Sequence, residues 1–121
     1  MMNYRIVENS CQRYVEALPF YARLESERDA LDLVAICGEN ETHLLMLHAE
    51  NLTEDFYDLS SGLAGAILLK FVNYRLRVVA VLTPQMVEQG KFHEMVIETN
   101  RGSDFRVFYN RDLAETWLLS G

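Results

Sequence analysis

Apolar residues in this chain follow two spacings, one typical of strands and one typical of helices. Near the N-terminus, two β-rich runs over 4–7 and 14–18 flank a polar stretch. Asn9-Ser10 lies in or near the point where a turn would join the two runs, so the pattern predicts an antiparallel hairpin. Pro19 ends the second run, because proline has no N–H to donate within a sheet.

The first helical pattern follows Ser26. Four apolar residues recur at the i, i+3, i+4 and i+7 spacing of one helix face, namely Ala30, Leu33, Val34 and Cys37. This spacing predicts a helix over about 27–37. Ser26 and Asp29 resemble a capping box at its start. Gly38 stands where a C′ glycine would end it.

Later segments alternate between the two patterns. Apolar runs predict core strands, and helical spacings predict helices between them and after the last one, with Asn110 as the N-cap of the final helix and a short helical turn at Thr83-Pro84. The strands are expected at 44–47, 77–82 and 105–109, and the helices at 63–72, 91–100 and 111–118. The run at 44–47 lacks alternation, as expected for a strand covered on both faces.

This order, β-β-α-β-α-β-α-β-α, predicts one α/β domain over residues 1–121. Its sheet is mixed and mostly parallel, with about five strands and an antiparallel N-terminal hairpin. A chain of 121 residues that is 50% apolar can bury a core of its own.

Charge and composition narrow the classes of function. Eleven basic against eighteen acidic residues give a net charge of −7, which disfavours nucleic-acid binding. We expect no membrane span, because the longest near-apolar segment, 63–69, is too short, and no signal peptide, because the N-terminus has no apolar region. Cys11 and Cys37 lack a C-x-x-C spacing, so we expect reduced core thiols in a cytosolic protein.

The stretch 43–82 carries the candidate chemistry. It predicts a βαβ unit with an acidic, aromatic connection between its first strand and its helix. Ser60 or Ser61 is expected to cap that helix, and its N-terminus, with Gly62, would favour a phosphate or another anion. Phe56 and Tyr57 are expected to anchor the connection by burying their rings, or, if exposed, to mark a partner surface.

Acidic residues follow the first strand of this unit, where open α/β sheets bind ligands. His48, Glu50, Asp55 and Asp58 could bind a divalent metal or act as acid and base. The alternative is a solvated acidic loop in which His48 hydrogen-bonds within a turn. The spacing matches no metal motif, and no catalytic triad or nucleotide-binding motif is found. The sequence thus predicts no catalytic residue, metal or cofactor.

Three segments, DALDLVAICGEN (29–40), LLMLHAENLTEDFYDLSSGLAGAILLKFVNYRLRVVAV (44–81) and IETNRG (97–102), resemble the bacterial family catalogued as domain of unknown function 4180. This resemblance implies no activity. DLSSGLAGAILLKF (58–71) is more distantly similar to the helix start of STAS domains, the sulfate-transporter and anti-sigma-factor-antagonist fold.

In the antagonists the first serine of a pair is phosphorylated, which switches partner binding. By resemblance, Ser60 and Ser61 match that pair, followed by Gly62. Leu59 stands where that family usually has an aspartate, so Asp58 is one residue early, and the connection 50–59 is longer than in the family.

Two functions follow as hypotheses. The first is a small cytosolic bacterial module, STAS-like and non-enzymatic, that regulates or binds a protein partner, with a homodimer as a further possibility. The second is an enzyme, metal-binding protein or small-ligand binder that uses the acidic residues of 48–58. It predicts that His48, Glu50, Asp55 and Asp58 converge on one concave pocket.

Overall fold

Five strands form one mixed sheet in the computed structural model, which describes residues 4–19 and 23–121. Their order is β1-β2-β3-β4-β5. The first pair is antiparallel and the other three pairs are parallel. The strands are β1 (Tyr4–Asn9), β2 (Gln12–Ala17), β3 (Leu44–His48), β4 (Arg77–Val81) and β5 (Phe105–Phe108). The predicted α/β fold with an N-terminal hairpin and a five-stranded, mostly parallel sheet is confirmed.

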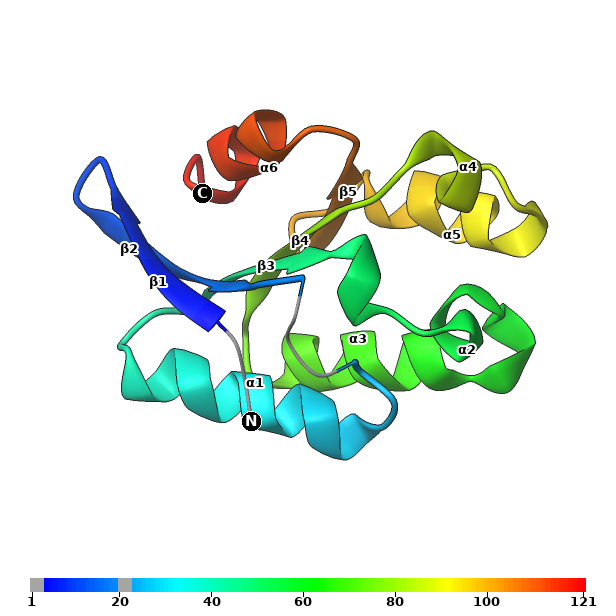
Figure 1. Cartoon of the computed structure of the whole chain (residues 1–121), viewed down its shortest axis with the longest axis horizontal. Coiled ribbons are helices and arrows are strands. Elements are labelled where there is room, and N and C mark those ends of the chain that lie inside the picture. The colour runs from blue at the N-terminus through cyan, green and yellow to red at the C-terminus, as the bar shows by residue number, and fades with distance from the viewer. Residues whose placement is uncertain (1–3, 20–22) are drawn as a thin grey trace.

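In the described part of the chain, six α-helices and two short 3₁₀ turns connect and cover these strands. They are α1 (Glu27–Glu39), η1 (Ala49–Asn51), α2 (Glu54–Tyr57), η2 (Leu59–Ser61), α3 (Leu63–Asn73), α4 (Pro84–Val87), α5 (Gly90–Thr99) and α6 (Arg111–Leu118). Figure 1 shows α1 and α3 on one side of the sheet and α6 on the other. Across the described residues, none of these helices has the length and apolarity that crossing a membrane requires.

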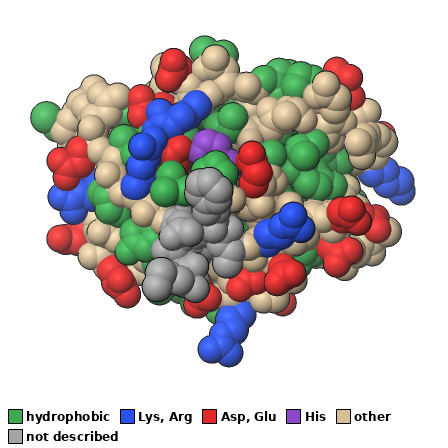
Figure 2. Space-filling model, in the orientation of Figure 1, with side chains coloured by type: hydrophobic (Ala, Val, Ile, Leu, Met, Phe, Trp, Pro, Cys, Tyr) green, Lys and Arg blue, Asp and Glu red, His purple; other side chains and the backbone are tan. Residues whose placement is uncertain are grey.

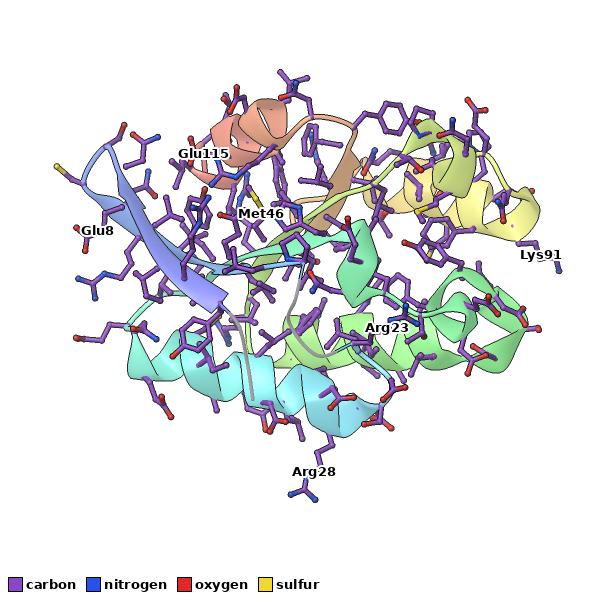
Figure 3. All side chains as sticks on the ribbon, in the orientation of Figure 1. Glu8, Arg23, Arg28, Met46, Lys91 and Glu115 are labelled. Atoms are coloured by element: carbon purple, nitrogen blue, oxygen red, sulfur yellow. The ribbon has the colours of Figure 1, made fainter. Side chains whose placement is uncertain are left out.

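The core has two parts because β3 and β4 are covered on both faces. Leu45 and Leu47 belong to the larger cluster, with residues of α1, α3 and α5, whereas Leu44 and Met46 belong to the smaller cluster, with residues of α6. Figure 3 shows Met46 between the sheet and α6. This explains why the 44–47 run is apolar at every position.

The β1–β2 turn is formed by Ser10 and Cys11, directly after Asn9 at the end of β1, so Asn9-Ser10 lies in or near the turn as predicted. Ser10 and Cys11 both have positive φ, 55° and 64°, as a two-residue type I′ hairpin turn requires. Cys11 is therefore exposed, so the prediction of a core thiol is wrong there. Cys37 is a buried thiol as predicted, and burial raises its pKa to about 12.

Helix ends differ from the predictions in three places. Gly38 does not end α1, because the helix continues to Glu39 and the residue with positive φ is Glu41. Ser26 makes no side-chain cap bond, and its hydroxyl donates to Asp29 instead. Asn110 caps α6 as predicted, since its side-chain oxygen accepts hydrogen bonds from two backbone N–H groups. The third difference, at the start of α3, belongs to the site described below.

Asn100, at the end of α5, makes two hydrogen bonds with the outer edge of β5. Its Nδ2 donates to the carbonyl of Val107, and its Oδ1 accepts from the N–H of Val107. The side chain therefore occupies the place of a neighbouring strand at that residue.

Acidic side chains are spread around the face shown in Figure 2, with fewer basic ones between them. This distribution agrees with the net charge of −7.

Candidate functional site

The connection from β3 to α3 is a series of short helical turns rather than an open loop. Thr53 caps α2, because its hydroxyl accepts a hydrogen bond from the N–H of Phe56. The ring of Phe56 is fully buried, and Phe92 of α5 meets both aromatic rings edge-on, with centroids 6.2 Å from Phe56 and 5.0 Å from Tyr57. The predicted anchoring by a buried ring is confirmed for Phe56, whereas Tyr57 is only partly buried and packs against the core.

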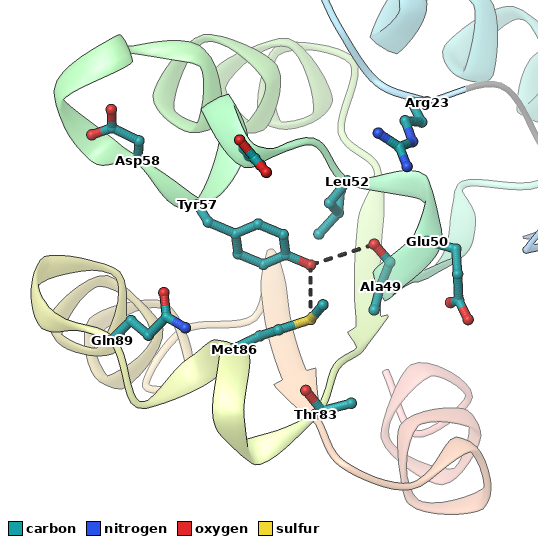
Figure 4. Close-up of a pocket in the computed structure, with 10 residues that line it drawn as sticks. Arg23, Ala49, Glu50, Leu52, Tyr57, Asp58, Thr83, Met86 and Gln89 are labelled. Carbon is teal, nitrogen blue, oxygen red and sulfur yellow. Dashed lines mark hydrogen bonds between the residues drawn. The ribbon is translucent and has the colours of Figure 1, made fainter.

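Beyond the carboxyl ends of β3 and β4 lies a cavity of about 760 Å³. Apolar groups form part of its wall, from Ala49, Leu52, Tyr57 and Met86. The Tyr57 hydroxyl lies 3.4 Å from both the Ala49 carbonyl oxygen and the Met86 sulfur, as Figure 4 shows. Burial, assisted by the charge of Glu50, raises the pKa of Tyr57 to about 12, so this phenol stays protonated at neutral pH.

Polar side chains complete the lining of the cavity: Arg23, Glu50, Glu54, Asp58, Thr83 and Gln89. The lining thus contains three carboxylates and one guanidinium. Among the described residues, the ion pairs of the chain involve neither these carboxylates nor Arg23. The charge of the lining is therefore −2 and is not neutralised by ion pairing within the described chain.

The structure brings only two of the four predicted acidic-connection residues to this cavity. Glu50 and Asp58 line it, together with Arg23 and Glu54, which the sequence argument did not single out. Asp55 is exposed and does not line it. His48 bonds to Glu16 of β2 instead. The expected convergence of all four side chains is not what the structure shows.

The serine corner is the turn formed by Ser60, Ser61 and Gly62. Asp58 caps η2: its Oδ1 accepts from the Ser60 N–H at 3.1 Å and from the Ser60 hydroxyl at 2.6 Å. The Ser61 hydroxyl donates to the carbonyl of Asp55. Both serines are exposed at this turn.

Gly62, with a φ of 80°, occupies the N-cap of α3, so the prediction that Ser60 or Ser61 caps this helix is wrong. Ser61 lies one residue too early, although its oxygen still accepts a hydrogen bond from the first N–H of the helix at 3.2 Å. Ser60 and Ser61 belong to the η2 turn, which ends before the Gly62 N-cap, so both serines lie ahead of the helix start.

A second polar cluster, the Glu16 network, lies on the face of the sheet that α6 covers. Glu16 is only 2% exposed. Arg5, its cross-strand partner on β1, donates to it at 2.8 Å. Arg111, at the start of α6, donates two hydrogen bonds at 2.8 and 3.0 Å. His48 Nε2 lies 2.7 Å from Glu16 Oε2, the oxygen that also accepts from Arg111 Nε.

These partners keep Glu16 ionised. Burial alone would raise its pKa, but the hydrogen bonds from His48, Arg111 and Arg5 outweigh burial and hold the pKa well below its usual range. The bonds to Glu16 in turn raise the pKa of Arg111. The cluster therefore connects β1, β2, β3 and α6 through one charge whose oxygens are all bonded.

Tyr14 extends this network toward the end of α6. Its hydroxyl donates to Glu115 at 2.6 Å and accepts from Arg111 at 2.9 Å. Burial and the hydrogen bond to Glu115 raise the pKa of Tyr14. A glutamate within the apolar run of β2 is the only signal of this network in the sequence.

Asn51 fixes the edge of the cavity nearest to Arg23. It is fully buried, its Nδ2 donates to the carbonyl of Leu18, and its Oδ1 accepts from the N–H of His48. Its own carbonyl accepts from the N–H of Leu24 at 2.8 Å. These bonds hold Leu18 and Leu24 against η1, and Arg23, next to Leu24, lies beside the cavity.

Within residues 4–19 and 23–121, no three His, Cys, Asp or Glu side chains are grouped as a metal site requires. Residues 10–118 match the model of a family described as a domain of unknown function (DUF4180). No curated protein and no solved structure matches the chain.

Proposed function

We propose that this chain, which belongs to the DUF4180 family, is a non-enzymatic regulatory module that binds a protein partner through its serine corner. The observation that carries the proposal is the exposed Ser60 hydroxyl, held on Asp58 at 2.6 Å in a turn anchored by the buried Phe56. A polar group on a rigid, exposed turn can be read by a partner without a large ordering cost.

The order of elements supports the same proposal. An antiparallel β1–β2 pair is followed by alternating helices and parallel strands, and α3 begins directly after the serine corner. This is the arrangement that the STAS resemblance implies. Fold alone does not fix function, so the proposal depends on the corner and not on the sheet.

Phosphorylation of Ser60 would act on the Asp58 cap. It would replace the hydroxyl donor with a group carrying roughly −2 charge beside the Asp58 carboxylate. Repulsion would then oppose the η2 turn and change the surface that a partner contacts. The bacterial cytoplasm fits this role, because Cys11 and Cys37 are both free thiols.

A site-specific photo-crosslinker tests the partner surface. We place it at Ser60 in the full chain, expressed in the native host, and at Thr116 on the exposed side of α6 as the control. A discrete adduct with one protein is expected from position 60 and not from position 116. The same adduct pattern at both positions, or an adduct at position 116 alone, would contradict the proposal.

Intact mass tests the switch separately. Chain purified from the native host is expected to carry one phosphoryl group that disappears in Ser60→Ala and persists in Ser61→Ala. Loss in the Ser61 variant alone would move the modified position. A chain that is unmodified under every growth condition would contradict the phosphorylation switch but not the partner-binding surface.

A second candidate function is small-ligand binding in the cavity. Its volume of about 760 Å³ falls within the range of small-molecule sites, and its place beyond the carboxyl ends of β3 and β4 is where open α/β sheets bind ligands. Native mass spectrometry of gently purified chain is expected to show a bound small molecule, which Gln89→Trp would exclude by filling the cavity rim. A chain that is empty in both forms would contradict this candidate.

A further inference from the structure

We propose that the cavity selects a small organic cation: a primary ammonium group carried on an apolar body of a few carbons. This inference rests on the second candidate function, that the cavity is a ligand site, and adds the chemical class of the ligand. It does not depend on whether the serine corner binds a partner.

The apolar part of the wall selects the body of the ligand. Leu52, the Tyr57 ring and the Met86 thioether line the cavity together with Ala49. Burying alkyl groups against such a wall is favourable, and the gain grows with the number of CH₂ groups buried. An inorganic cation would leave this surface in contact with water, so the wall favours an organic ligand.

The charge of the cavity lining selects the sign of the ligand's charge. Glu50, Glu54 and Asp58 outnumber Arg23, and among the described residues no Lys or Arg forms an ion pair with any of the three carboxylates. In a partly enclosed site with apolar walls, like charges raise the local concentration of an oppositely charged ligand. An anionic ligand would meet three carboxylates for one guanidinium.

Tyr57 can attract a cation through its aromatic ring, without carrying a charge itself. Its phenol stays protonated because its pKa is about 12, so the ring is neutral and its π-face is attractive to ammonium groups. Its hydroxyl is already directed at the Ala49 carbonyl and the Met86 sulfur. The ring therefore lies across the cavity in a fixed orientation.

The arrangement of the charges defines where an ammonium group would lie. Figure 4 shows Arg23 and Glu50 at one end of the cavity and Asp58 at the other, with the Tyr57 ring between them. Repulsion from Arg23 therefore places the ammonium group toward the Asp58 end. The apolar body then extends along the ring and Met86.

Three probes of equal length and different charge test the inference: pentylamine, pentan-1-ol and pentanoate. Each is titrated into uniformly ¹⁵N-labelled chain at neutral pH and constant ionic strength, and amide shifts are followed. Pentylamine is expected to shift amides around the cavity, including those of Tyr57, Met86 and Gln89. Its affinity should exceed that of pentan-1-ol roughly tenfold, and pentanoate should bind most weakly.

Variants tie the preference to the cavity. The double variant Glu50→Gln with Glu54→Gln removes two lining charges that take part in no side-chain cap. It keeps Asp58, the carboxylate at the ammonium end, so it should weaken pentylamine binding severalfold, by less than the full preference over pentan-1-ol, while leaving pentan-1-ol unchanged. Gln89→Lys adds a cation at the cavity and should have the same effect. Asp55→Asn is the matched control, because this carboxylate is exposed on α2 but does not line the cavity.

Three results would overturn the inference. Binding of pentan-1-ol or pentanoate as tight as that of pentylamine would leave a ligand cavity without the cation preference. A loss in Asp55→Asn equal to that in the double variant would show general charge attraction. The absence of cavity shifts with all three probes would remove both the inference and the second candidate function, while the serine-corner proposal would stand.

Discussion

The Glu16 network and the cavity both contain carboxylates near the carboxyl end of the sheet, but these carboxylates differ in whether they have partners within the chain. Glu16 is 2% exposed and receives hydrogen bonds from two arginines and lies against a histidine. The carboxylates of the cavity form no ion pairs among the described residues. A buried charge whose oxygens are all bonded holds elements together, whereas unneutralised charges beside a hollow remain available to a ligand.

The two regions use neighbouring residues of one segment. His48 is the last residue of β3 and points to the face covered by α6, where it meets Glu16. Glu50, two residues later, lines the cavity. Within three residues at the end of β3, His48 therefore has a structural role and Glu50 has a candidate binding role.

The largest effect should come from removing the central charge of the network. Glu16→Ala would leave Arg111, His48 and Arg5 without their shared acceptor, and breaking a buried ion pair typically costs about 3 kcal/mol or more. Urea unfolding followed by circular dichroism measures the change. Arg5→Ala is the comparison, since the Arg5 side chain is 55% exposed and its loss should cost under about 1 kcal/mol.

Acid should weaken the Glu16 network. The pKa of Glu16 in the folded chain lies below its unfolded value of about 4.3. The unfolded chain therefore binds more protons in acid, and this stabilisation is present above about pH 5 and is lost as pH falls toward the folded pKa. Each unit of pKa difference corresponds to about 1.4 kcal/mol.

Urea titrations over a series of acidic pH values test this linkage. Glu16→Gln should show a flatter decline than the natural chain, because its network no longer includes a group that must be protonated. Equal declines in the two proteins would mean that Glu16 is not the group that controls acid stability.

The two tyrosines offer a matched test of intermediate size. Tyr14→Phe removes hydroxyl bonds to Glu115 and Arg111 in the network, and bonds to charged partners contribute about 2 kcal/mol. Tyr57→Phe removes only the longer contacts at 3.4 Å, so its cost should be under about 1 kcal/mol. Thermal and urea unfolding of both variants would rank them, and the opposite ranking would contradict the contrast between the regions.

The smallest change in stability should come from the cavity itself. Glu50→Gln with Glu54→Gln removes carboxylates that have no partner to lose among the described residues, so unfolding free energy should stay within about 0.5 kcal/mol. A loss as large as that of Glu16→Ala would show that these residues serve the fold after all.

Local sequence patterns predicted the elements well, because each depends on residues close in the chain. The unbroken apolar run before His48 predicted a strand buried on both faces, and Asn110 predicted the start of the last helix. Predictions at other ends were less accurate. The pattern predicts that Gly38 ends α1 by adopting a left-handed conformation. The helix instead continues to Glu39, and the residue with positive φ beyond its end is Glu41.

The sites were only partly predictable because they join distant segments. Glu16 and Arg111 are 95 residues apart, and nothing near either residue indicates the other. The pocket was expected at the end of β3, and Glu50 and Asp58 do line the cavity there. Arg23 could not be placed, because its position depends on hydrogen bonds that Asn51 makes across the fold.

Asn100 affects whether strands from other molecules can pair with the β5 edge of this sheet. Its side chain bonds the N–H and the carbonyl of Val107, which face the open edge of β5 while the Val107 side chain is buried in the core. Strand addition is thereby opposed at one end of the sheet, while β1 forms the other end. Repeated edge-to-edge addition would require β5 of one copy to pair with β1 of the next, and the Asn100 side chain occupies the hydrogen-bonding groups that such pairing would need at Val107.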